Sequence, residues 1–153
     1  TIITLYQSKM HQFIAEQLKV HSITRRYEAI VHGKLSDDGT VRGDIGRNPN
    51  DRLKMAIVAK NGKPAVTHYR VLEQLNGYTH ISCELETGRT HQIRVHMKHI
   101  GHPLPGDFLY NPDYSVISRQ ALHSHKLRFK HPITKIDMEF TAKLPEDMST
   151  IIN

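Results

Sequence analysis

The sequence predicts one α+β domain in which helices pack on a mixed, mainly antiparallel sheet. Two Asn-Gly dipeptides, Asn61-Gly62 and Asn76-Gly77, each separate stretches that alternate apolar and polar residues. Such turns between alternating stretches are the strongest short-range signal for antiparallel strands. A helical pattern covers residues 4–20, and a second one follows Thr90. The length of 153 residues fits a single domain, 1–153, with its own core.

The other elements follow from alternation and turn residues. The helix after Gly88 is expected to take Thr90 as its N-cap and to run to Ile100, with Gly101 just beyond it. A short terminal helix is expected after Leu144-Pro145. The Gly- and Asn-rich segment 43–51 is expected to be irregular. The expected strands cover residues 24–31, 53–59, 65–75, 78–86, 119–129 and 136–142.

Charge favours a polyanionic partner. The formal net charge is +6 and the sequence pI is about 9.5, which suits RNA or DNA. No apolar run approaches the roughly 18 residues of a spanning helix, and no signal-peptide pattern opens the chain. The single cysteine, Cys83, lies in a strand pattern and is expected to be a buried thiol. A reducing compartment, the cytoplasm, follows as the expected location.

The stretch Leu85–His96 concentrates polar side chains at a strand-to-helix junction. It places Arg89, His91 and Arg94 within the turn and the first helical turn. Arginines there suit an anion, because a helix N-terminus offers unpaired N–H groups and the positive end of the helix dipole. The alternative is an ordinary capped helix whose arginines are merely solvated.

Histidines raise two other chemical readings. Of the histidines near this helix, only His96 and His99 have facing spacing, and no Cys cluster or His-Glu-x-x-His pattern accompanies them, so a metal site is not expected. Two histidines with a nearby lysine could act as general acid and base on an RNA phosphodiester, but no distinctive spacing supports a nuclease. Phosphate-binding P-loop and dinucleotide glycine patterns are absent.

Tyr27 has two readings on pattern alone. It lies on the apolar face of an alternating strand, where a tyrosine is usually part of the core. It also follows Arg25-Arg26, and an aromatic ring beside positive charge is typical of a base-stacking platform. Periodicity does not choose between the two.

Several separated blocks resemble the RluA-type pseudouridine synthases, which act on ribosomal and transfer RNA. The resemblance covers nearly the whole chain, and its most specific block is the Leu85–His96 stretch. The matching blocks are Arg26-Tyr27-Glu28-Ala29 with Gly33, Gly62–Tyr69, Leu85–His96 continuing into Gly101-His102-Pro103 and Gly106-Asp107…Tyr110, and then His131-Pro132, Leu144-Pro145 and Asp147-Met148.

The resemblance implies an isomerase that converts uridine in RNA to pseudouridine without cofactor or metal. It implies that an aspartate is the nucleophile, that Tyr27 stacks on the flipped base, and that Arg94 pairs with the aspartate. These roles suit the chemistry, since a base must leave its helix before its glycosidic bond can be reached. The RNA contacts expected around them are Arg25, Arg26, Arg47, Arg89, His91 and Lys98.

One block of the family pattern does not occur. The nucleophilic aspartate is expected in a His-Arg-Leu-Asp block upstream of Tyr27, whereas Asp51-Arg52-Leu53 has the wrong order and lies downstream. We therefore expect the C-terminal part of a catalytic domain, inactive alone. Its sheet is expected to be incomplete on the N-terminal side, which favours self-association or rearrangement there. The alternative is a non-catalytic RNA-binding module; in either case the expected partner is structured ribosomal or transfer RNA, and no membrane.

Overall fold

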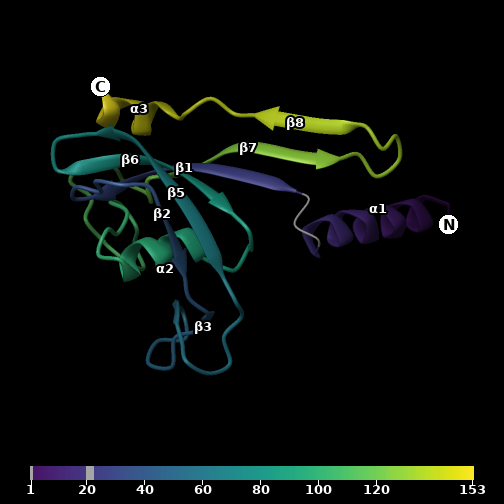
Figure 1. Ribbon diagram of the computed structural model, residues 1–153, viewed down its shortest axis with the longest axis horizontal. Helices are drawn as coiled ribbons and strands as arrows, with labels where there is room; N and C mark the ends of the chain where they lie inside the picture. The colour runs from purple at the N-terminus through teal and green to yellow at the C-terminus, as the bar shows by residue number, and fades with distance from the viewer. Residues whose placement is uncertain (1, 20–22) are drawn as a thin grey trace.

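A six-stranded antiparallel sheet organises the molecule (Figure 1). The computed structural model describes residues 2–19 and 23–153, with side chains for 7–18 and 23–153. The strand order is β2-β5-β6-β1-β7-β8. Every described pair is antiparallel, which confirms the α+β class. The strands are β1 (Thr24–His32), β2 (Gly39–Arg42), β5 (Val66–Gln74), β6 (Tyr78–Leu85), β7 (Leu122–Lys130) and β8 (Asp137–Thr141).

The two Asn-Gly turns behave differently. Asn76-Gly77 joins β5 to β6 as predicted, and Gly77 takes a φ of +81°, a conformation that glycine adopts without steric cost. The prediction that Asn61-Gly62 joins two paired strands is wrong. The short strand before this turn, β4 (Met55–Ile57), pairs instead with β3 (Ile45–Arg47), which precedes it in the chain. The strand β3 lies in the segment that was expected to be irregular.

Burial explains this second hairpin. Ile45 is only 2% exposed and lies in a small apolar cluster with Ala65, Val95 and Tyr110. Burial of the Ile45 side chain in this cluster therefore packs the β3–β4 hairpin against the helix α2 (Gln92–His99). The Gly- and Asn-rich composition around Ile45 concealed this anchor.

The two faces of the sheet carry different helices. On one face Ala29 and Val31 of β1 pack with Ile93 and Met97 of α2. The alternate residue Ile30 belongs to a second cluster, which includes residues of the terminal helix α3 (Glu146–Ile152). Side chains alternate along a strand, so α2 and α3 cover opposite faces, as Figure 1 shows.

Cys83 lies at the centre of this arrangement. It is fully buried on β6, directly across from Tyr27 of β1. Burial raises the pKa of the thiol to about 12. The prediction of a buried thiol is confirmed.

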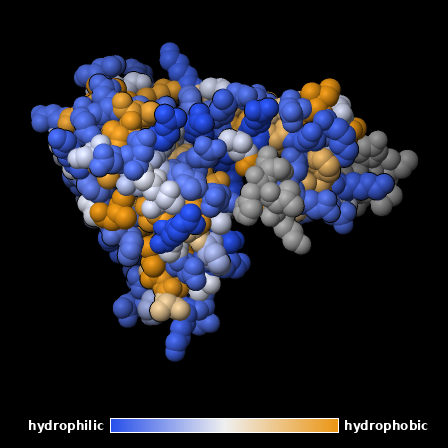
Figure 2. Space-filling view, in the orientation of Figure 1, coloured by the Kyte–Doolittle hydropathy of each residue, from blue (hydrophilic) through white to orange (hydrophobic). Residues whose placement is uncertain are grey.

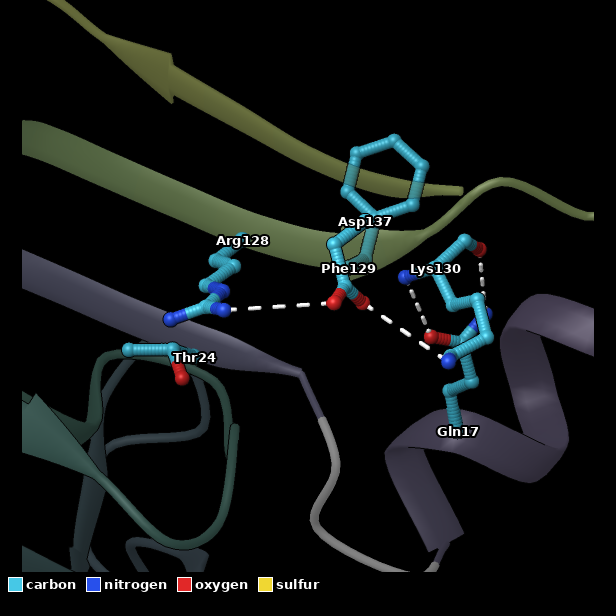
Figure 3. Close-up of a pocket in the computed structure, with 6 residues that line it drawn as sticks. All are labelled: Gln17, Thr24, Arg128, Phe129, Lys130 and Asp137. Carbon is cyan, nitrogen blue, oxygen red and sulfur yellow. Dashed lines mark hydrogen bonds and ion pairs between the residues drawn. The ribbon is translucent and has the colours of Figure 1, made fainter. Parts of the chain in front are cut away.

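The first helix, α1 (Ile2–Lys19), lies beside the far end of β7 and β8, and not in the core (Figure 1). Residue 20 of the expected helix 4–20 lies outside the described residues. Gln17 holds α1 in place: its amide donates to the Lys130 carbonyl at 2.8 Å and accepts from the Lys130 N–H at 2.8 Å (Figure 3). Met10 and Leu18 of this helix remain 36% and 40% exposed and lie outside the core, although apolar residues at helical spacing usually pack in it.

We call the part formed by α1, β7 and β8 the outer end. Its apolar side chains are poorly covered, and Figure 2 shows such groups on the surface over this region. The Phe129 and Phe140 rings stack at 6.0 Å, yet Phe140 stays 53% exposed. Ile133 and Ile136, in the β7–β8 connection, are 52% and 62% exposed. None of the described helices is long and apolar enough to cross a membrane.

Candidate active site

The turn between β6 and α2 is locked by one buried amide. Gln92 is 3% exposed, and its carbonyl accepts from the Thr87 hydroxyl at 2.8 Å and from the Arg89 N–H at 3.0 Å. Its NH₂ group donates to the Val66 carbonyl at 3.0 Å and to the Thr67 hydroxyl at 2.9 Å. Gln92 therefore fixes the turn to β5 and sets the direction in which α2 starts.

The helix starts one residue later than the sequence indicated. His91 is the N-cap, with a left-handed φ of 57° and no side-chain capping bond, so the prediction of Thr90 as N-cap is wrong. The Gln92 amide already satisfies an N–H of the turn, which is the usual work of a capping hydroxyl. At the other end Ile100 is the C-cap and Gly101 follows with a φ of +87°, as predicted.

Arg94 is buried against a carboxylate of this chain. Its Nε and Nη2 each donate to Asp107 at 2.7 Å, and the two side chains are 8% and 1% exposed. Backbone N–H groups of Leu109 and Tyr110 also donate to Asp107, at 3.1 and 3.2 Å. Burial alone would raise the pKa of Asp107, but these bonds and the Arg94 charge bring it below its ordinary value. The pair is therefore ionised.

This pairing changes the picture drawn from the sequence, in which the only carboxylate expected to serve Arg94 lay outside the chain. Asp107 is too enclosed to attack a substrate, so it holds Arg94 in position. Arg94 spends Nε and Nη2 on Asp107, and its Nη1 has no hydrogen-bond partner among the described residues. The Gly106-Asp107 dipeptide was part of a matched block but received no role, because nothing local in the sequence connects it to Arg94.

Tyr110 is the centre on which one stripe of α2 converges. Its ring lies 5.0 Å from Cζ of Arg94 and 5.9 Å from Nζ of Lys98, and the His91 ring meets it edge-on at 5.6 Å. Both cations lie within the range of cation–π attraction. His91, Arg94 and Lys98 thus share one stripe of the helix, and Tyr110 is the residue to which the sequence analysis gave no role.

The Tyr110 hydroxyl links this cluster to the β3–β4 hairpin. It accepts from the Met55 N–H at 2.9 Å and lies 2.8 Å from Nδ1 of His91. Since the amide can only donate, the hydroxyl proton is free to bond Nδ1 of a neutral imidazole. Burial, followed by the Arg94 charge, lowers the pKa of His91, which favours that neutral form. Burial raises the pKa of Tyr110, which keeps the phenol protonated.

Tyr27 lies on the same face of the sheet as α2. It is partly buried and packs against the cluster that contains Ile93. Its ring is thus partly in the core, and its role as a base-stacking platform stays a prediction. Arg25 shares this face because it is two residues away, whereas Arg26 points to the other face, with Nη2 at 3.7 Å from Glu84.

The remaining expected RNA contacts line two grooves beside α2. Arg47 and Arg89 border one of about 340 Å³ together with Lys63, and no acidic side chain lines it. Each arginine is steadied by a carbonyl: Arg47 donates to Arg52 and Arg89 to Pro64. Lys98 borders the second groove, of about 410 Å³, with Tyr110 at its wall.

Comparison with known proteins places this geometry in a family. Residues 6–99 match the sequence pattern of a family described as RNA pseudouridylate synthase. The chain belongs to the RNA pseudouridylate synthase family. The resemblance inferred from the motif blocks is therefore confirmed.

Relatives within this family are similar along most of the chain. An RNA pseudouridine synthase of Bacillus subtilis, described as uncharacterised, is 51% identical over 144 residues, which cover 93% of this chain and 47% of that protein. The ribosomal large subunit pseudouridine synthase D of Nitrosomonas europaea is 47% identical over 148 residues, covering 91% and 43%. The chain thus spans about half the length of these relatives or less.

Solved pseudouridylate synthase structures share the fold. Human RNA pseudouridylate synthase domain containing 1 has a TM-score of 0.73 at 29% identity, over 86% of this chain and 59% of that one. Human RNA pseudouridylate synthase domain containing 4 has a TM-score of 0.71 at 23% identity, over 93% and 65%, and supports the fold alone.

His96, one of the two histidines with facing spacing on the helix, has a structural role. His96 is fully buried, with Nδ1 at 2.8 Å from the Thr67 hydroxyl and Nε2 at 3.1 Å from the Gly43 carbonyl. Burial lowers its pKa. In the described ranges, no three His, Cys, Asp or Glu side chains lie close enough to hold a metal ion.

Proposed function

We propose that this chain supplies the arginine and tyrosine of a pseudouridine synthase site that isomerises uridine in ribosomal or transfer RNA. The observation that carries the proposal is the Arg94 guanidinium, clamped by Asp107 with Nη1 left for a second carboxylate. The nucleophilic aspartate would come from a segment that these 153 residues do not include. An unpaired, buried Cys83 supports a cytoplasmic location.

Each residue has a distinct task in this scheme. A uridine that leaves the RNA stack loses a few kcal/mol of stacking, and the Tyr27 ring offsets part of that loss. Nη1 of Arg94 keeps the incoming aspartate ionised and therefore nucleophilic. The N1–C1′ bond breaks and a C5–C1′ bond forms, so the base gains a proton at N1 and loses the proton at C5.

Loss of the C5 proton gives a direct assay. The full-length protein, with the residues that precede this chain, is incubated with a large-subunit ribosomal RNA transcript or a transfer RNA transcript made with 5-tritiated uridine, and tritium release is measured. Arg94→Ala should nearly abolish release with only a modest loss of RNA affinity. A parallel fall of affinity and turnover would mean that Arg94 is a phosphate contact.

A control is needed because Arg94→Ala leaves Asp107 buried without its cation. Breaking one half of a buried pair costs roughly 3–5 kcal/mol, whereas replacing both halves with apolar residues is often tolerated. The double variant Arg94→Met/Asp107→Leu removes both charges together. Folded but inactive protein would assign the defect to the reaction.

A non-catalytic RNA-binding module is the second candidate. The groove lined by Arg47, Lys63 and Arg89 favours it, because this groove needs no nucleophile to bind RNA. The coding sequence upstream of Thr1 decides between the two. A His-Arg-Leu-Asp block there supports the enzyme, and its absence together with RNA binding but no tritium release supports the module.

We also propose that the chain, when isolated, self-associates through the outer end. Phe140 and Ile136 are more than half exposed on and beside the edge strand β8, and an exposed apolar edge invites pairing. Sedimentation of the chain should show concentration-dependent association that Phe140→Lys reduces. Leu53→Lys, at a position 77% exposed on the β3–β4 hairpin, is the matched control. A monodisperse wild-type monomer would refute the proposal.

A further inference from the structure

Arg25 stands apart from the other arginines of the structure. Four of the partly or fully buried ones have a partner: Arg26 pairs with Glu84, Arg94 with Asp107 and Arg119 with Asp147, while Arg89 donates to the Pro64 carbonyl. Arg25 is also partly buried, yet it has neither a hydrogen bond nor an ion pair within the described residues. Its Nε is fully enclosed and unsatisfied. No described carboxylate balances the charge of this partly desolvated side chain, and the rest of its guanidinium is open to an anion.

The fold sets where the Arg25 guanidinium lies. Arg25 is at the end of β1 where β6 leaves the sheet, since its neighbour Arg26 pairs with Glu84. It faces the side covered by α2, two residues from Tyr27. The guanidinium rests on the turn before α2, where a Cβ added to Gly88 would overlap its Nη1. Glycine at position 88 therefore makes room for this side chain.

The charges around Gly88 indicate the kind of anion. Gly88 also lines the groove whose cations are Arg47, Lys63 and Arg89 and which has no acidic side chain. Arg25 extends this row of positive charge towards Tyr27. A continuous row of cations suits the repeated charges of a nucleic-acid backbone.

We propose that Arg25, seated on Gly88, binds a phosphodiester of the RNA strand next to the nucleotide that stacks on Tyr27. This site rests on the proposed RNA function and adds a specific contact to it. A guanidinium donates two parallel hydrogen bonds to a phosphate, and the partial burial of Arg25 strengthens them. Phosphate contacts set the register of a bound strand, so Arg25 would place the correct base over Tyr27.

Salt dependence tests the site. The affinity of the full-length protein for an in vitro transcribed large-subunit ribosomal RNA is measured from 50 to 300 mM salt. Arg25→Ala should weaken binding about tenfold at the lower salt, as expected for one charged hydrogen-bonded contact. The slope of log affinity against log salt should fall by about 0.7–0.9, the value for one lost phosphate contact. A structural role would leave the slope unchanged.

Two further variants sharpen the test. Gly88→Ala keeps every charge but displaces the guanidinium, and its backbone has no left-handed φ to strain, so binding should weaken while the fold persists. Arg70→Ala removes an equal charge from an exposed position on the opposite face of the sheet and should change affinity less than twofold. An Arg25→Ala protein with wild-type affinity and slope, and with tritium release intact, would refute the Arg25 site alone. A wild-type protein that neither binds nor modifies the RNA would refute the proposed function and this site together.

Discussion

The two ends of the sheet differ in how deeply their polar side chains are buried and in how well these are hydrogen-bonded. Where α2 covers it, polar groups are buried and nearly all satisfied, as Arg94, Asp107, Gln92 and His96 show. At the outer end Asp137 meets Arg128 and Lys130 only at 3.9 and 3.8 Å, with all three side chains half exposed (Figure 3). A guanidinium is held rigidly only where its hydrogen bonds are buried, as under α2. The exposed outer end instead leaves surface that another polypeptide can cover.

Two ion pairs make this contrast measurable. Arg94–Asp107 and Arg119–Asp147 share the same two-pronged geometry, at 2.7 Å and 2.9 Å. The first is almost fully buried, while the side chains of the second are 39% and 40% exposed. The two pairs therefore differ in solvent exposure and not in geometry.

The largest effect is expected from Asp107→Asn. It should lower the free energy of unfolding by roughly 3–5 kcal/mol, because Arg94 is left charged, buried and without its anion. Asp147→Asn, the matched change, should cost about 1 kcal/mol or less. Urea denaturation of both variants provides the measurement. Equal losses would show that burial does not distinguish the two pairs.

Tyr110→Phe should have the next largest effect. The phenylalanine keeps the ring against Arg94 but strands the Met55 N–H and removes the bond to His91, for an expected loss of about 1–3 kcal/mol. Tyr114→Phe, at a position 52% exposed, serves as the control and should be neutral. Hydrogen exchange at the Met55 amide should accelerate in Tyr110→Phe, and an unchanged rate would contradict the proposed link to the hairpin.

Acid should destabilise the fold through His96. Its folded pKa lies below the unfolded value of about 6.5, so the unfolded chain binds more protons. The stability that neutral His96 contributes is therefore complete above about pH 6.5 and declines as pH falls towards the folded pKa. His96→Gln should flatten this pH dependence, whereas His99→Gln, on the exposed surface, should keep it.

The smallest effect is expected at the outer end. Ile136→Ser, at a position 62% exposed, should change the free energy of unfolding by no more than about 0.5 kcal/mol. Thermal unfolding of the variant at low protein concentration, where association is minimal, checks this value. A loss of several kcal/mol would show that the outer end is as well packed as the end beneath α2.

The sequence predicted the parts of the fold whose signals are local. The alternation around Tyr27, the turn at Asn76-Gly77 and the stop at Gly101 each depend on a few adjacent residues, and each is confirmed. The helical period over 4–20 located a helix but not its surroundings. Apolar periodicity shows which face of a helix is suited to burial. It does not show whether another element of the fold buries that face.

The site was less predictable because its partners are distant in the chain. Arg94 stood out as a charged residue on a helix, but its mate Asp107 lies beyond a proline-rich loop. Tyr110 lies in the loop after α2 and contacts His91, Arg94 and Lys98 of the helix and its N-cap. The turn before α2 depends on Gln92 reaching back to β5, which no capping rule anticipates. Side-chain pairing across loops leaves no periodic trace.

Cys83 is a natural reporter of how often the core of the molecule opens. It is the only thiol, it lies opposite Tyr27, and burial raises its pKa to about 12. Because only an exposed thiolate reacts with alkylating reagents, labelling must wait until the core between the sheet and α2 opens. The rate of alkylation in the native protein therefore reports how often the core beside Tyr27 opens, with a natural thiol as the reporter.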